Sequence, residues 1–291
     1  MPNSASKPPL PLRQYFALQS YLSTLLLLSV LFLPRSSHSF FNPTDLPLQR
    51  SSADRPEHPF LTPLTVSPRR TMLWILAGMT ICMLWWGQHL RTWVNRSKTK
   101  SKGTSGEVKS SSNGGHGNGE KSKNTKVDGE KEKVWETANR IKEAFSSTVV
   151  GSAVIMILLL ILGSPMDSHL IETYLLSLHL SCLLVWPVVH SMGIPSMYDP
   201  GILHRYQYTK LFSYLDPETP VDRALLYPAL GTMVGAWIGA LPLPLDWDRP
   251  WQSYPLTLAF GSVLGFIIGG WVSFLHSATR SLVQQVQSEK L

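Results

Sequence analysis

Residues 148–189, TVVGSAVIMILLLILGSPMDSHLIETYLLSLHLSCLLVWPVV, hold two apolar blocks joined by a short polar turn. Residues 148–162 carry no charged side chain, and residues 169–189 carry a single carboxylate. Nearly unbroken apolar blocks are typical of membrane-spanning helices, whereas a soluble helix mixes apolar and polar residues at its own period. We therefore expect two spans in a helical hairpin, with Gly163 and Pro165 in the turn between them.

Four further apolar blocks surround this hairpin. They lie at residues 15–33, 72–90, 224–241 and 256–276. A helix needs roughly 20 residues to cross a bilayer, and these blocks come close to that length. The sequence therefore predicts an all-α, polytopic membrane helix bundle of about six transmembrane helices, with both ends of the chain in the cytoplasm.

The first block also allows a second interpretation. Residues 25–33 could form the apolar core of a signal peptide that is removed from the mature protein. Gln19, Ser20 and Ser23 lengthen the block beyond a typical signal core, so we favour a retained span. Under either interpretation, the segment that follows emerges on the lumenal side.

Polar stretches between the blocks predict how the chain is divided. The longest, residues 91–133, is rich in Ser, Gly, Asn and Lys, which is the composition of a linker without a packed core. Its basic residues outnumber its acidic ones, so we expect it in the cytoplasm. Residues 1–90 then form an N-terminal region with two spans, and residues 134–291 form a four-span core. That core opens with an amphipathic helix at residues 134–145, which can run on into the span at 148–162.

The net charge of +7 does not indicate nucleic-acid binding. Its basic side chains lie beside or between the apolar blocks, where they set the orientation of a membrane protein. The lipid bilayer is therefore the expected partner. Five arginines oppose a lumenal placement of residues 34–71, but the larger basic excess of residues 91–133 decides the orientation. These arginines are Arg35, Arg50, Arg55, Arg69 and Arg70.

Each of the last two predicted spans carries glycines four residues apart. The two sets are Gly231, Gly235 and Gly239, and Gly261, Gly265 and Gly269. Residues four apart share one face of a helix, so each helix presents a flat stripe along which another backbone can approach closely. Two interpretations stay open at this stage: the stripes pack against each other, or one of them binds a partner helix.

The connection between these spans is the strongest candidate for a lumenal contact site. Asp246 and Asp248 flank Trp247, Arg249 follows, and Trp251 has the character of an interfacial anchor. The two acids and the arginine could bind a cation, an amine or a phosphate, or they could form a salt-bridged turn. We favour the turn, because two carboxylates two residues apart are a weak metal signal. No metal or cofactor is expected.

Two ionisable residues of the predicted fourth span, Glu172 and His179, are seven residues apart and share a helix face. They could line a pathway through the membrane. A glutamate at the lumenal edge and a neutral histidine packed in the bundle are the favoured interpretation. The sequence contains no H-E-x-x-H, Walker or G-x-S-x-G motif, so no catalytic residue is predicted.

Residues 231–252, GTMVGAWIGALPLPLDWDRPWQ, carry a family resemblance. From Gly235 through Gln252, and again at Pro255, the chain resembles the PIG-F family pattern G-A-W-x-G-A-x-P-x-P-L-D-W-[DE]-R-x-W-Q-x-W-P. Tyr254 stands where the family usually has Trp. The turn Gly163-Ser-Pro165 and the sequence His169-x-x-Glu172-Thr173 also resemble the family's G-[AS]-P turn and the start of its fourth helix.

This resemblance implies a six-span protein of the endoplasmic reticulum membrane that acts in glycosylphosphatidylinositol (GPI) anchor biosynthesis. It implies a noncatalytic subunit that stabilises or positions the large ethanolamine phosphate transferases, which carry the lumenal catalytic domain. A rival interpretation is a subunit that itself handles the lipid head group or takes part in catalysis. A weaker third is a transporter whose pathway includes Glu172 and His179.

Overall fold

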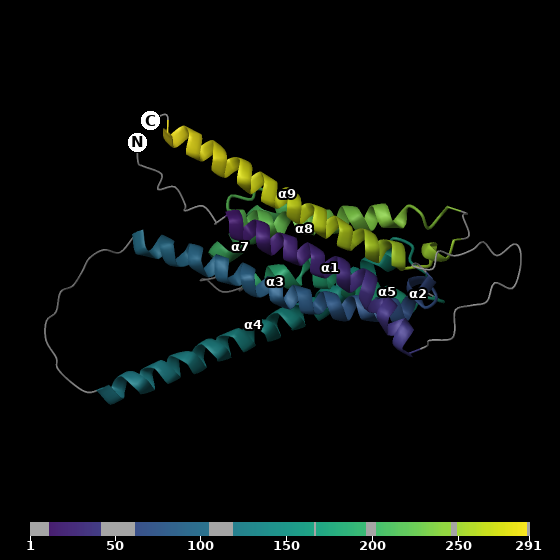
Figure 1. The fold of residues 1–291 in the computed structure, drawn as a ribbon, viewed down its shortest axis with the longest axis horizontal. Helices are drawn as coiled ribbons and strands as arrows, with labels where there is room; N and C mark the ends of the chain where they lie inside the picture. Colours follow the sequence, from purple (N-terminus) through teal and green to yellow (C-terminus); the bar gives the residue numbers. More distant parts are fainter. Residues whose placement is uncertain are drawn as a thin grey trace, which may run out of the picture.

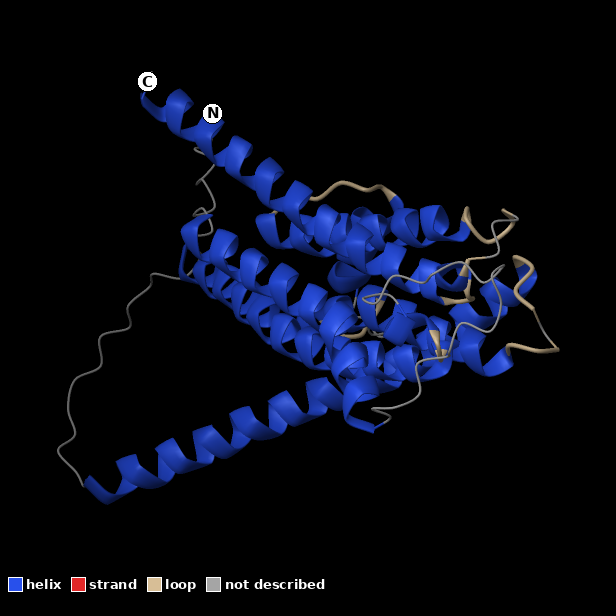
Figure 2. Ribbon diagram, turned by 45° about the vertical axis from the view of Figure 1, so that its right-hand side comes forward, coloured by secondary structure: helices blue, strands red, loops and turns tan. Residues whose placement is uncertain are grey.

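The computed structural model of the chain describes residues 12–41, 62–104, 119–165, 167–195, 202–245 and 249–289. These residues form helices joined by loops and contain no strand (Figures 1 and 2). The α-helices are α1 Leu12–Phe41, α2 Thr62–Thr65, α3 Pro68–Thr104, α4 Gly119–Ile161, α5 Leu170–Leu184, α6 Trp186–Met192, α7 Ile202–Tyr208, α8 Pro220–Ala240 and α9 Leu256–Glu289. A π-helical turn η2, Thr209–Ser213, and a 3-10 turn η3, Pro250–Gln252, complete the order.

Five of these helical stretches are long and apolar enough to cross a bilayer: Leu12–Ser36, Pro68–Arg96, Val134–Ile161, Leu170–Met192 and Leu256–Glu289. The remaining predicted span, residues 224–241, falls largely in α8, whose first two turns also carry the charged residues Asp222 and Arg223. It packs along α9 in the same bundle (Figure 1). The prediction of an all-α polytopic bundle of about six helices is confirmed.

The long helices run side by side in alternating directions (Figure 1). The first residues of α1 and the last residues of α9 lie at one end of the bundle. The α4–α5 turn and the α8–α9 connection lie at the other end, which we call the turn end. This alternation is the arrangement expected of successive membrane crossings. In two views the first half of α4 projects away from the other helices (Figures 1 and 2).

Several helices extend beyond the predicted spans. Helix α1 continues through Pro34 to Phe41, and α9 continues to Glu289. Much of the predicted linker is also helical, because α3 runs to Thr104 and α4 begins at Gly119. Neither of these polar extensions contains proline, and the α4 extension is rich in Glu and Lys, which are good helix formers. The amphipathic helix predicted at residues 134–145 is continuous with the span after it.

The predicted fourth span, residues 169–189, is divided in two. Helix α5 ends at Leu184, and α6 begins at Trp186 with Pro187 in its first turn. Proline lacks the N–H that would continue the hydrogen-bond ladder, so the break falls where the first turn of a helix tolerates it. Val185 between them keeps a helical backbone, and the chain therefore continues in nearly the same direction.

Helix α1 is held against α9 by hydrogen bonds as well as by apolar packing. The Tyr15 hydroxyl donates to Ser273 Oγ at 2.8 Å, and Trp271 Nε1 donates to Ser23 Oγ at 3.1 Å. The Tyr15 ring also meets Trp93 of α3 edge-on, with ring centroids 5.4 Å apart. The N-terminal region and the four-span core are therefore parts of one bundle.

Candidate functional site

The two glycine stripes face each other across the α8–α9 interface. A Cβ atom added at Gly231 would collide with the carbonyl oxygen of Gly265, and one added at Gly235 would collide with that of Gly261. Gly239 approaches the carbonyl of Thr257 in the same way, and Gly269 approaches that of Tyr227. The contacts keep a constant antiparallel register along the pair. In this structure both stripes are used within the chain, and neither is left as a face for a partner helix.

This interface is built from backbone rather than from side chains. Without side chains between them, the two helices come close enough for backbone atoms to touch along several turns. Close packing of this kind drives helix association in lipid, where burial of apolar surface contributes little. The α8–α9 hairpin is therefore a rigid unit that fixes the position of its connection at the turn end.

An ion pair joins α3 and α5 at the turn end. Arg69 Nε donates to Glu172 Oε1 at 2.5 Å. Arg69 lies in the first turn of α3, and Glu172 lies in the first turn of α5, where the helix dipole favours a negative charge. Glu172 is 5% exposed, whereas the Arg69 side chain is 54% exposed. The arginine therefore neutralises a carboxylate that the fold has removed from solvent.

Three hydroxyl groups meet beside this ion pair. The Tyr254 hydroxyl lies 2.7 Å from Ser164 Oγ and 3.0 Å from Thr173 Oγ1, and these two oxygens are 3.0 Å apart. Thr173 also donates to the carbonyl of His169 at 2.9 Å. The contacts connect the α4–α5 turn, the start of α5 and the entry to α9. The three segments that carry the family resemblance thus converge at the turn end.

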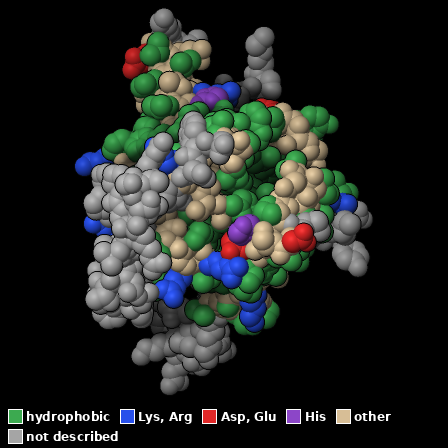
Figure 3. Space-filling model, turned by 90° about the vertical axis from the view of Figure 1, so that its right-hand side faces the viewer, with side chains coloured by type: hydrophobic (Ala, Val, Ile, Leu, Met, Phe, Trp, Pro, Cys, Tyr) green, Lys and Arg blue, Asp and Glu red, His purple; other side chains and the backbone are tan. Residues whose placement is uncertain are grey.

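Within the part of the chain that the structure describes, two buried polar atoms of this region have no hydrogen-bond partner: Glu172 Oε2 and His169 Nδ1. His169 Nδ1 lies 3.8 Å from the other carboxylate oxygen, Oε1. Its ring also contacts the Tyr254 ring, with centroids 6.0 Å apart. Figure 3 looks onto the turn end and shows a histidine beside acidic and basic side chains on this face. A buried polar group without a partner costs about 1–3 kcal/mol, and more when it is charged.

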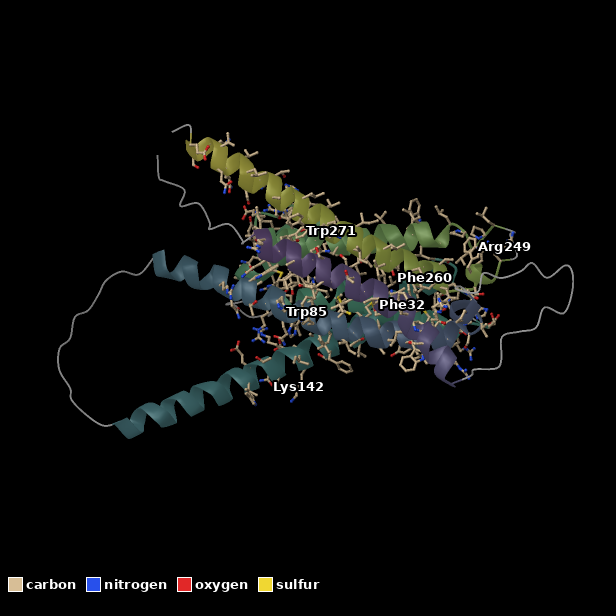
Figure 4. All side chains as sticks on the ribbon, viewed as in Figure 1. Phe32, Trp85, Lys142, Arg249, Phe260 and Trp271 are labelled. Atoms are coloured by element: carbon tan, nitrogen blue, oxygen red, sulfur yellow. The ribbon has the colours of Figure 1, made fainter. Side chains whose placement is uncertain are left out.

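The connection between α8 and α9 is held closed by Gln252. Its side-chain Nε2 donates to the carbonyls of Pro242 at 2.8 Å and Leu245 at 2.9 Å, and its Oε1 accepts from the Arg249 N–H at 3.0 Å. Arg249 lies at the outer edge of the turn end (Figure 4). Trp251 is half-buried in η3. The other predicted contact residues, Asp246, Trp247 and Asp248, lie outside the described part of the chain.

His179 occupies a separate, deeper position. It is fully buried between α5 and α9, where its Nε2 lies 2.9 Å from Ser262 Oγ. The Ser262 hydroxyl donates to the carbonyl of Ala259, so it accepts from His179 and places that proton on Nε2. Glu172 has different partners, Arg69 and His169. The two ionisable residues of this helix therefore belong to two different sets of contacts.

Sequence reasoning did not find two of the residues at this site. From the sequence, Arg69 is only a charge that opposes the lumenal placement of its segment, and its pairing with Glu172 gives that charge a structural role. In the sequence, Tyr254 is only a departure from the family's Trp, whereas in the structure its hydroxyl joins two other segments. Among the side chains that the structure describes, no group of three or more His, Cys, Asp or Glu is arranged to hold a metal ion.

Comparison with known proteins gives several partial matches. The Debaryomyces hansenii protein "Glycosylphosphatidylinositol anchor biosynthesis protein 11" is 37% identical over 132 residues, which are 44% of this chain and 51% of that protein. The human "GPI ethanolamine phosphate transferase, stabilizing subunit" is 29% identical over 113 residues, 39% of this chain and 48% of that protein. The chain thus matches about half the length of these curated relatives. No solved structure gives a significant match.

A family model gives the broadest match. The model described as "GPI biosynthesis protein family Pig-F" matches residues 58–274, which include α3 to α8 and most of α9. The matched range contains both glycine stripes, Arg69, Glu172 and the α8–α9 connection. Since this range is about three quarters of the 291-residue chain, the protein belongs to the PIG-F family of GPI biosynthesis proteins.

Proposed function

We propose that this protein is a noncatalytic subunit, in the membrane of the endoplasmic reticulum, of the ethanolamine phosphate transferases that act on the GPI anchor precursor. The observation that carries the proposal is the similarity to the human protein named as the stabilizing subunit of such a transferase, within a family match over residues 58–274. In this role the protein stabilises or positions the large catalytic subunit, and the turn end lies on the lumenal side, where transfer takes place.

The helix that supports a partner-binding role is α4. Its apolar outer face is exposed along the whole span, at Val150, Val154, Ile157 and Ile161. By contrast, the stretch formed by α5 and α6 is largely buried inside the bundle. The glycine stripes of α8 and α9 already pack on each other. Of the candidate spans in the described residues, the one in α4 is the least buried, so it offers the broadest surface to the helices of a transferase. The same helix leads into the α4–α5 turn, so a partner on α4 would also contact the turn end.

The test is an affinity purification of the tagged protein from detergent-solubilised membranes. It compares wild type with Val154→Trp/Ile157→Trp, which changes the shape of the α4 face but keeps it apolar. A matched control, Leu264→Trp, places the same side chain on the exposed face of α9. We expect a transferase to co-purify with wild type and the control and to be depleted in the α4 variant, with anchor intermediates lacking ethanolamine phosphate accumulating. If no transferase co-purifies with wild type, the proposal is wrong.

A second variant separates this role from the rival one, in which the protein handles the head group directly. Asp246→Ala/Arg249→Ala changes the predicted contact loop and leaves the α4 face intact. Loss of the transferase in this variant supports a loop that binds the partner. A complex that stays intact while intermediates lacking ethanolamine phosphate accumulate supports direct head-group handling by the loop, and contradicts a purely stabilising role.

A further inference from the structure

The two unpartnered atoms at the turn end are both able to accept a hydrogen bond. Glu172 Oε2 belongs to an ion-paired carboxylate and is an acceptor only. His169 Nδ1 accepts when the imidazole proton is on Nε2. Because the Nδ1 atom lies 3.8 Å from Glu172 Oε1, the two groups form one acceptor-rich spot at the start of α5. Among the described residues, no donor reaches either of the two unpartnered atoms.

The described side chains around this spot make no hydrogen bond to either atom. The neighbouring hydroxyls of Ser164, Thr173 and Tyr254 bond to one another and to the carbonyl of His169. Arg69 reaches the other oxygen of the carboxylate, Oε1, through its Nε. A primary ammonium group has three N–H donors on one atom and a positive charge, so it matches two acceptors and a carboxylate. A quaternary ammonium has no N–H and cannot make these bonds.

The primary ammonium is one requirement on the ligand, and the exposed part of Arg69 adds a second. Its side chain is 54% exposed, although its Nε is bound to Glu172. A guanidinium has further N–H donors in a fixed plane that suits the oxygens of a phosphate. A ligand that meets both requirements therefore carries a primary ammonium tethered by a short linker to a phosphate.

We propose that Arg69, His169 and Glu172 bind a phosphoethanolamine group at the turn end. The ammonium lies against Glu172 Oε2 and His169 Nδ1, and the phosphate lies against the exposed guanidinium of Arg69. The inference rests on the proposed function in one respect, the choice of phosphoethanolamine among compounds with this chemistry. With this site, the subunit binds the same group that its partner transfers. The group can be the head group of phosphatidylethanolamine or part of a water-soluble phosphoethanolamine compound.

The experiment is native mass spectrometry of the full-length protein, purified in detergent and supplied with equal amounts of phosphatidylethanolamine and phosphatidylcholine. Hydrogen bonds to charged groups predict a preference of roughly tenfold for the primary ammonium. Glu172→Gln is expected to abolish that preference. Glu136→Gln is the matched control, because it removes the acid of another interhelical ion pair, with Arg91 of α3. His169→Phe keeps the ring beside Tyr254 but removes Nδ1, and is expected to reduce the preference several-fold.

Equal binding of the two lipids by wild type overturns the inference, and so does a preference that survives in folded Glu172→Gln or is unchanged in His169→Phe. Soluble O-phosphoethanolamine is then added as a competitor. Displacement of the lipid identifies the phosphoethanolamine group itself as the ligand, whereas a preference that resists the competitor identifies the membrane lipid as its source.

Co-purification of the transferase, measured with the same preparations, tests the proposed function separately. Wild type that prefers phosphatidylethanolamine but binds no transferase contradicts the proposed function and leaves the lipid site in place. A transferase that co-purifies with wild type lacking any lipid preference contradicts only the lipid site.

Discussion

The α8–α9 interface and the turn end hold helices together by opposite means. Between α8 and α9, glycine backbones touch and no side chain intervenes. At the turn end, one ion pair and three hydroxyl groups join segments that come from four parts of the chain. The first contact needs small residues at regular spacing, whereas the second needs particular atoms at particular distances. The comparison shows that one bundle can combine a tightly packed glycine hairpin with a polar cluster that contains unpartnered acceptor atoms.

The largest expected effect comes from a side chain placed in the backbone interface. In Gly265→Val the new Cβ collides with the backbone carbonyl of Gly231, which no rotamer change can relieve. We expect a loss of about 3 kcal/mol or more, seen as little monodisperse protein in size-exclusion chromatography. Ile268→Val on the exposed face of the same helix is the control and should behave as wild type. A stable Gly265→Val protein would mean that the two helices are less tightly apposed.

The next effect concerns the ion pair of Arg69 and Glu172. Removing the arginine should cost more stability than removing the glutamate. Arg69→Ala leaves Glu172 buried without its cation, and we expect a loss of about 2 kcal/mol in thermal unfolding measurements. Glu172→Ala leaves an arginine that is already half in solvent, so its loss should be smaller. The double variant should be more stable than Arg69→Ala alone. Strictly additive effects would show that the two residues do not interact.

A smaller effect is expected from the hydroxyl group that joins three segments. Tyr254→Phe removes its hydrogen bonds to Ser164 and Thr173 and should cost about 1 kcal/mol in the same measurement. Tyr174→Phe, on an exposed part of α5, is the matched control and should change little. Equal melting temperatures for the two variants would remove Tyr254 from the polar cluster.

The smallest effect comes from a second ion pair, Lys210–Glu218. It tests whether the Arg69–Glu172 pair stabilises the protein because its carboxylate is buried, and not because the two charged groups are close together. Lys210 donates to Glu218 at 2.5 Å, the same distance as in the Arg69–Glu172 pair, but it lies outside the membrane spans. The hydrogen bond to Glu218 raises the pKa of Lys210. Any stabilisation is therefore present below the ordinary lysine pKa and is lost as pH rises through the raised value. Lys210→Met should leave the melting temperature at neutral pH unchanged, whereas a clear drop would contradict this comparison.

The difference between the two regions also explains what the sequence could predict. The glycine stripes are visible because Gly231, Gly235 and Gly239 repeat at the helical period, and the spans are visible because each is a continuous apolar block. The stripes left two interpretations open, since spacing alone does not say which helix lies opposite. Only the three-dimensional structure shows that each stripe faces the other.

The polar cluster could not be predicted in this way. Arg69 and Glu172 are 103 residues apart, and Tyr254 and Thr173 are 81 residues apart, with no periodic signal to connect them. The lengths of α3 and α4 could not be predicted either, because composition alone does not show where a helix ends. Low-complexity composition indicated a linker at residues 91–133, whereas α3 and α4 extend into it from both sides. The family resemblance identified the segments that meet at the turn end, but not the atoms that meet there.

The contact between α1 and α9 has a consequence for how the protein is made. Tyr15 pairs with Ser273, and Ser23 with Trp271, so α1 finds its partners in a helix that is synthesised much later. Until α9 enters the membrane, the Tyr15 hydroxyl has no access to that partner, and a polar group left unpaired in lipid is unfavourable. A chain that lacks α9 therefore leaves these polar groups of α1 without the partners that they have in the bundle. Insertion of α9 covers these groups, and it can do so only after the other described helices have been translated.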